Sequence, residues 1–144
     1  MIDVENAVIN TVATSLRSAY ASTYTKLKVY GEYVEFPEAF PCVSIWCTDN
    51  YTNLPTRELN DTDEHYANVM FTTEVYTVGA SRKADAKLLA NFVDGQFRDM
   101  GFTRAAMMVL PNADRNAYRI TLRHTGLVER PIGDNDSLIS LVYR

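Results

Sequence analysis

The amino-acid sequence predicts an α+β domain, with two helices packed on one face of a mixed or antiparallel sheet of about five strands. Apolar residues recur at helical spacing near the N-terminus and again in residues 82–100. Elsewhere, short segments alternate in polarity and are rich in β-branched and aromatic residues, as strands are. Most of these segments follow one another as hairpins, so helices and sheet are expected to form separate layers.

The length and composition predict one folded domain over residues 1–144. A chain of about 150 residues buries roughly 70% of its unfolded surface, which is enough for a core without disulfides. The hydrophobic content of 47% and the charged content of 22% are ordinary for such a domain. The formal net charge of −4 argues against binding to nucleic-acid phosphates, because that binding needs a basic surface.

We expect neither a membrane segment nor a secretion signal. The longest apolar run, residues 105–110, is far shorter than the about 20 residues that cross a bilayer. The first residues contain neither the basic region nor the apolar region of a Sec-type signal.

The first helix should begin after Asp3, whose side chain can cap it, and end within residues 20–25, where Ser, Thr and Tyr accumulate. Its apolar stripe follows helical spacing and comprises Val4, Val8, Val12 and Leu16.

Two strands should follow, in residues 27–34 and 42–47, because both segments alternate in polarity. Pro41 fixes the backbone where the second strand begins. Cys42 and Cys47 lie five positions apart on that strand, so they should face opposite ways and not pair. We expect both thiols to pack in a reducing cytoplasm.

Residues 49–64 predict a long polar loop, because Asn, Thr and Asp dominate and Pro55 interrupts regular structure. A loop of about 15 residues exceeds the usual length in a compact domain, so it should be functional or mobile. Near its end lie Asp61, Asp63 and Glu64. The loop lacks the glycine and distal glutamate of an EF-hand, which favours a solvated acidic loop over a cation site.

The longest strand signal, residues 65–78, is apolar on both faces. It therefore predicts a central strand or one covered by a neighbouring subunit. A second helix is expected in residues 82–100, capped by Ser81 and ended by Gly101 in a left-handed conformation. Gly95 costs about 1 kcal/mol relative to Ala in a helix interior, so we expect close packing against it.

Residues 102–110 and 117–128 predict a hairpin, and residues 137–144 alternate and could add a last strand. In the second arm of the hairpin, alternate residues should face opposite ways, with Tyr118, Ile120 and Leu122 on one face and Arg119, Thr121 and Arg123 on the other.

No catalytic or metal-binding constellation is visible in the sequence. There is no Gly-x-Ser-x-Gly elbow, no phosphate loop and no dinucleotide fingerprint. His65 and His124 are far apart, and neither adjoins a cysteine. We therefore expect no catalytic residue, cofactor or metal. The alternative is a small enzyme or ligand-binding domain, which would need a deep pocket lined by His124 or His65 with convergent carboxylates.

Charges of opposite sign are concentrated in different parts of the chain, basic on the hairpin and acidic in the 49–64 loop. A solvated face of mixed charge and a head-to-tail contact between copies explain this equally well. In the second case, Arg119 or Arg123 should lie at a contact between subunits or rings. The candidate interface residues are Asp61, Asp63, Glu64, Arg115, Arg119 and Arg123.

In their order and spacing, several short segments resemble the tail terminator, or tail-completion, family of long-tailed phages and prophages. The resemblance spans nearly the whole chain and begins with the N-terminal helix. The segments that carry it are VYGEYV at 29–34, FPCV at 40–43, NVMFTTEVY at 68–76, KADAK at 83–87, MGFTR at 100–104, PN at 111–112 and YRIT at 118–121.

The resemblance implies a virion structural protein of the tail or neck, present in the host cytoplasm during assembly. Members of this family form a hexameric ring at the head-proximal end of the tail tube. The ring stops tube polymerisation and offers a docking surface to head-completion or connector proteins.

DNA passes through the lumen of such a ring without specific binding, and an acidic lumen would repel it and let it slide. The loop at 49–64 would project from the ring towards the tube or the connector and become ordered only on assembly. Another neck component, either a head–tail adaptor with a twelvefold ring or a minor tail protein, stays open as an alternative.

Overall fold

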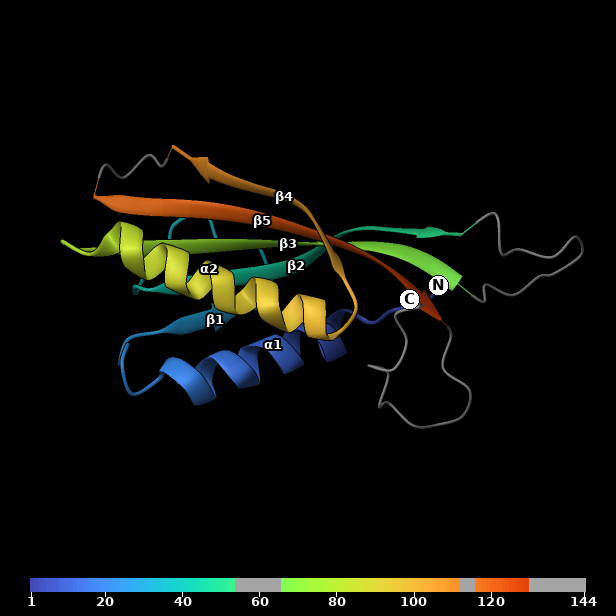
Figure 1. Cartoon of the computed structure of the whole chain (residues 1–144), viewed down its shortest axis with the longest axis horizontal. Helices are drawn as coiled ribbons and strands as arrows, with labels where there is room; N and C mark the ends of the chain where they lie inside the picture. The colour runs from blue at the N-terminus through green and yellow to red at the C-terminus, as the bar shows by residue number, and fades with distance from the viewer. Residues whose placement is uncertain (54–65, 112–115, 130–144) are drawn as a thin grey trace, which may run out of the picture.

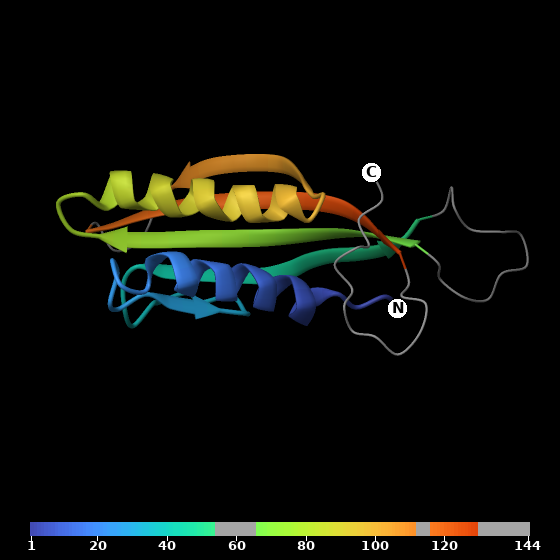
Figure 2. The same ribbon diagram turned by 60° about the horizontal axis from the view of Figure 1, so that its bottom comes forward.

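The computed structural model describes residues 1–53, 66–111 and 116–129. Its elements are α1 (Glu5–Tyr20), β1 (Lys28–Tyr30), β2 (Cys42–Thr52), β3 (Tyr66–Val78), α2 (Arg82–Asp99), β4 (Thr103–Leu110) and β5 (Ala117–Glu129). The strands form one open sheet in the order β1-β2-β3-β5-β4, and both helices cover the same face of it (Figure 1 and Figure 2). This confirms the predicted α+β architecture.

The sheet is mixed, because β1 runs parallel to β2 while the other neighbouring strands are antiparallel. β3 lies in the middle of the sheet and pairs with β2 on one side and with β5 on the other. This confirms the prediction of a central strand from apolar residues on both of its faces. β4 and β5 form the predicted hairpin.

The segment expected as a loop at 49–64 is partly strand, because β2 continues to Thr52. The pairing of β2 with β3 shifts register between Cys47 and Asp49. This β-bulge lies at Thr48, whose hydroxyl donates to the Met70 carbonyl at 3.2 Å. Beyond the bulge, polar residues continue the pairing with the start of β3. The structure does not describe residues 54–65, which include the tip of the expected loop. Residues 112–115 and the last expected strand also lie outside the described residues.

The first strand is shorter than expected, at Lys28–Tyr30, because the chain leaves the sheet edge at Gly31. Residues 31–41, which we term the crossover segment, pass over the sheet face that the helices leave open. Two hydrogen bonds hold the segment there. The Ser44 hydroxyl donates to the Glu32 carbonyl, and the Tyr76 hydroxyl, whose single proton is shared with Glu74, reaches the Val34 carbonyl at 3.3 Å.

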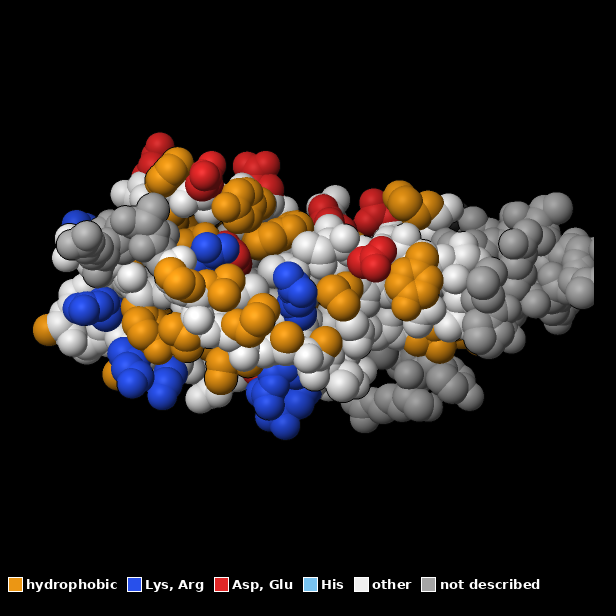
Figure 3. Space-filling model, turned by 90° about the horizontal axis from the view of Figure 1, so that it is seen from above, with side chains coloured by type: hydrophobic (Ala, Val, Ile, Leu, Met, Phe, Trp, Pro, Cys, Tyr) orange, Lys and Arg blue, Asp and Glu red, His pale blue; other side chains and the backbone are white. Residues whose placement is uncertain are grey.

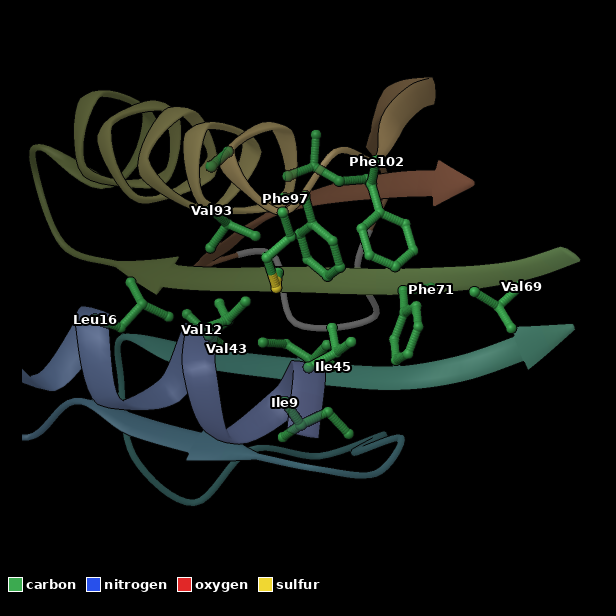
Figure 4. Packing of buried hydrophobic residues seen from close by; sticks show 14 of the residues in the cluster. Ile9, Val12, Leu16, Val43, Ile45, Val69, Phe71, Val93, Phe97 and Phe102 are labelled. Atoms are coloured by element: carbon green, nitrogen blue, oxygen red, sulfur yellow. The ribbon is translucent and has the colours of Figure 1, made fainter. Parts of the chain in front are cut away.

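The hydrophobic core lies between the two helices and the sheet (Figure 4). Helix α1 contributes the predicted apolar stripe, and Phe97 of α2 meets Phe71 of β3 and Phe102 with ring centroids 5.8 and 5.5 Å apart. Between the helices, the Tyr24 hydroxyl donates to Asp85 at 2.9 Å. The side chains that Figure 4 labels are Ile9, Val12, Leu16, Val43, Ile45, Val69, Phe71, Val93, Phe97 and Phe102.

The helix ends follow local chemistry. The Asp3 carboxylate accepts a hydrogen bond from the Glu5 amide at 3.0 Å and so satisfies one free donor of α1. Gly101 has a φ of 92°, a left-handed value that favours glycine, and follows α2 as predicted. The expectation for Gly95 is wrong, because a Cβ built there has no neighbouring atom within 4 Å.

Candidate assembly surfaces

Arg119, predicted at a contact between subunits, forms an ion pair with Glu74 of the adjacent strand β3. The same carboxylate accepts hydrogen bonds from the Tyr76 hydroxyl and, at 3.3 Å, from the Thr121 hydroxyl. The Arg119 guanidinium also lies over the Tyr76 ring, 5.6 Å from its centroid. The Arg119 side chain is 20% exposed and that of Glu74 is 4% exposed. The contacts of Arg119 with Glu74 and Tyr76 therefore lie within its own chain.

The electrostatics of this cluster favour the charged form of Arg119. Burial alone would lower the pKa of Arg119, but the hydrogen bond and the charge of Glu74 raise it above its usual value. Burial and the bond to Glu74 raise the pKa of Tyr76, so its phenol stays protonated and remains a donor. The buried Glu74 carboxylate thus has an adjacent guanidinium and two hydroxyl donors, whereas the Arg119 Nε is buried without a hydrogen-bond partner.

Arg123 lies further along β5 and is exposed, opposite Thr72 of β3 and Ala106 of β4. It is the predicted interface residue that the described structure leaves available to a partner. The remaining predicted candidates, Asp61, Asp63, Glu64 and Arg115, lie outside the described residues.

His124 lies in the core. Its Nε2 is 2.8 Å from the Asp94 carboxylate, and its ring stacks on Phe97 at a centroid distance of 4.4 Å. Asp94 also accepts a hydrogen bond from Arg104 at 3.2 Å. Burial lowers the pKa of His124, and its ring is 0% exposed. In this conformation the imidazole cannot reach a solute.

The cysteines have the chemistry of packing residues. Cys42 is fully buried and Cys47 is half-buried, and both are free thiols. Burial, together with the nearby charge of Glu74, raises the pKa of Cys42 to about 12, which makes it a poor nucleophile near neutral pH. Within residues 1–53, 66–111 and 116–129, no group of three or more His, Cys, Asp or Glu side chains is placed to hold a metal ion. Neither of the two helices described is long and apolar enough to cross a bilayer.

The edge strand β4 is the most exposed apolar element. Among the described residues it pairs with β5 on one side and with no strand on the other. Met107 and Val109 are 53% and 52% exposed, and Met108 is 36% exposed. Proteins usually protect such an edge with lysine, proline or a covering loop, because an open edge pairs readily with another chain. The apolar run at 105–110, from which the sequence predicted only that no membrane span is present, lies in this strand.

An acidic surface lies on the crossover segment and consists of Glu32, Glu35 and Glu38, all exposed. Residues 31–41 contain no basic residue. Two aromatic side chains accompany the glutamates, Phe36 at 73% and Tyr33 at 51% exposed. Three glutamates at a spacing of three, without a cation, are a sequence signal that could have identified this surface.

A basic surface lies along α2 and consists of Arg82, Lys83, Lys87 and Arg98, all exposed. Figure 3 views the molecule along the β4 edge and shows the separation of charge. Acidic side chains gather along the upper border and many basic side chains along the lower border, with apolar side chains and further basic ones between them. The two charged surfaces therefore belong to opposite faces of the sheet.

Between α2 and β4 the surface is hollowed, with a cavity volume of about 230 Å³. We term this the helix–strand hollow. Its apolar lining includes Met107, Ile120 and Leu122, and Lys87 and Arg104 supply cations to it. Asp94, which lies 2.8 Å from His124 Nε2, also lines the hollow, whereas His124 itself is not among the lining residues.

Comparison of the sequence with protein-family models and with curated proteins finds no match.

Proposed function

We propose that this chain is a structural component of a phage tail, which associates with copies of itself into a closed ring at the head-proximal end of the tail tube. The ring ends tube polymerisation and presents a docking surface to head-completion proteins. The sequence segments that resemble the tail terminator family motivate this assignment. The structural observation that carries it is the apolar edge of β4, which no other described strand pairs and which suits a protein that completes its surface by assembly.

Two further observations support an assembly role. The acidic and basic surfaces lie on opposite faces of one sheet, so copies can attract one another head to tail. A head-to-tail contact uses two different surfaces of each subunit, and it closes into a ring when the rotation between copies permits. His124 and Glu74 are buried, and each contacts a partner within its own chain, Asp94 and Arg119 respectively.

Electron microscopy of the purified chain tests this proposal. The expected image is a ring with sixfold symmetry and an open lumen. A twelvefold ring would instead assign the chain to the head–tail adaptors, and particles of single-chain size at every concentration would contradict a ring-forming role.

A further inference from the structure

The crossover segment presents an aromatic side chain to solvent on a supported backbone. Phe36 is 73% exposed. The segment before it is tied to the sheet through the carbonyls of Glu32 and Val34, which accept from Ser44 and Tyr76. A preorganised aromatic residue loses little entropy when a partner covers it, which is why such residues anchor interfaces. Phe36 is therefore placed as an anchor, with Glu35 and Glu38 exposed around it.

The helix–strand hollow has the size and chemistry to receive one such side chain. Its volume of about 230 Å³ falls below the roughly 300 Å³ at which small-molecule pockets begin. Ile120 and Leu122 give it apolar walls, and Lys87 provides a cation at the same place, while the carboxylate of Asp94, which also lines the hollow, is paired with Arg104. Lys83 is exposed one turn earlier on α2, on the same side of the helix as Lys87.

We propose that the crossover segment of one copy docks into the helix–strand hollow of the next, with Phe36 inserted and with Glu35 and Glu38 facing Lys83 and Lys87. This inference rests on the proposed ring and names the contact that forms it. Charge complementarity selects a second copy as the occupant, since the acidic surface and the basic surface are carried by the same chain. Because they lie on opposite faces of the sheet, the contact is heterologous and repeats around a ring.

Charge exchange tests this contact. One variant carries Glu35→Lys and Glu38→Lys, so that both of its contact surfaces are basic. A second variant carries Lys83→Glu and Lys87→Glu, so that both are acidic. Each variant alone should need at least about a tenfold higher concentration than wild type for half-assembly, because like charges meet at every contact. Mass photometry over a dilution series measures this.

Mixing the two variants in equal amounts should restore the ring, because alternating copies place a basic surface against an acidic one at every contact. A chain that carries all four changes should also assemble alone. Arg17→Glu with Lys26→Glu, which reverses two exposed cations on and after α1, is the matched control and should assemble as wild type does.

The outcomes separate the two proposals. If wild type forms a ring and each variant alone forms it at the same concentration, this contact is wrong and the ring stands. If the variants fail alone and their mixture also fails although circular dichroism shows each folded, the contact is again wrong. If wild type forms no ring at any concentration, both the proposed function and the contact are overturned.

Discussion

At the residue scale, the ion pair between Arg119 and Glu74 makes a prediction about stability. Arg119→Ala leaves a carboxylate with 4% exposure without its cation, and removing one partner of a buried pair typically costs about 3–5 kcal/mol. The partial exposure of Arg119 places the expected loss at the lower end of that range, about 3 kcal/mol. Urea denaturation monitored by circular dichroism measures it.

Arg123→Ala is the matched control on the same strand. Arg123 is exposed, so the change should alter the free energy of unfolding by about 0.5 kcal/mol or less. Equal effects of the two substitutions would contradict a structural role specific to Arg119. The same contrast matters for assembly, because charge reversal at Arg119 would disturb the fold, whereas reversal at Arg123 tests a surface.

The buried His124 should make the free energy of unfolding depend on pH. Burial lowers its pKa in the folded protein, and its Nδ1 is buried without a hydrogen-bond partner. The unfolded chain, with a histidine pKa of about 6.5, therefore takes up the proton more readily than the folded chain. Above about pH 6.5, His124 is neutral in both states and should not make stability depend on pH. Below about pH 6.5, stability should fall until the pH passes the lowered pKa of His124 in the folded protein.

Thermal unfolding of wild type and His124→Gln between pH 7.5 and about pH 5 checks this. The variant should be less stable at pH 7.5 but lose less stability on acidification. A wild-type stability that rises between pH 6.5 and 5.5 would contradict a neutral, buried histidine.

At the scale of elements, Gly126 lets β5 pass closely under Phe102. A Cβ at Gly126 would lie 2.8 Å from the Phe102 ring, and that ring is held between Phe71 and Phe97. Gly126→Ala should therefore destabilise the protein by about 1–3 kcal/mol, as overpacked cores do. Chemical denaturation measures the change.

Gly95→Ala is the comparison, and it should act in the opposite direction. A Cβ at Gly95 meets no atom within 4 Å, and Ala is favoured over Gly in a helix interior by about 1 kcal/mol. A stabilised Gly126→Ala variant, or a destabilised Gly95→Ala variant, would show that the packing around these glycines differs from that described.

The β4 edge predicts where hydrogen exchange changes on assembly. Amides of β4 that point away from β5 should exchange quickly in the dissociated chain, since no described strand covers them. If the ring buries this edge, they should slow by at least tenfold, roughly the protection of a stable backbone hydrogen bond. Amides of β3, which lie between β2 and β5, provide the unchanged reference. If exchange in β4 is unchanged in an assembled ring, the β4 edge is not part of the interface.

The sequence predicts elements well where one signal dominates. Helix α2 was placed within a residue at its end because its apolar stripe stops before Gly101, whose positive φ fits only glycine well. The strand predicted at residues 42–47 ends too early, because the second half of β2 is polar. There the pairing with β3 and the bulge at Thr48 maintain the strand, and neither is visible in local periodicity.

The pairs that determine the site are harder to predict because they join distant positions. Glu74 and Arg119 are 45 residues apart, and Asp94 and His124 are 30 apart. Each pair forms only once the register between strands, or between helix and strand, is fixed. The sequence therefore correctly placed the charge on β5 but could not show that Arg119 turns to a partner within its own chain. The acidic surface on residues 31–41 was missed because a turn-rich connector gave no indication of the face it would cover.

At the scale of the whole molecule, the property that matters most is association between copies of the chain. A domain whose β4 edge is paired by no other described strand, and which carries one acidic and one basic surface, should complete its surface with copies of the same chain. Its core, with both helices on one face, is self-sufficient, so the free subunit should be folded before it assembles. Assembly then adds contacts without refolding, and the concentration of subunits controls it.

Native mass spectrometry of the wild-type chain over a range of concentrations tests this property most directly. We expect folded monomers at low concentration and a closed hexamer as the end state, with no accumulation of a two-fold dimer. A chain that stays monomeric at every concentration, or that stops at a dimer, would contradict it.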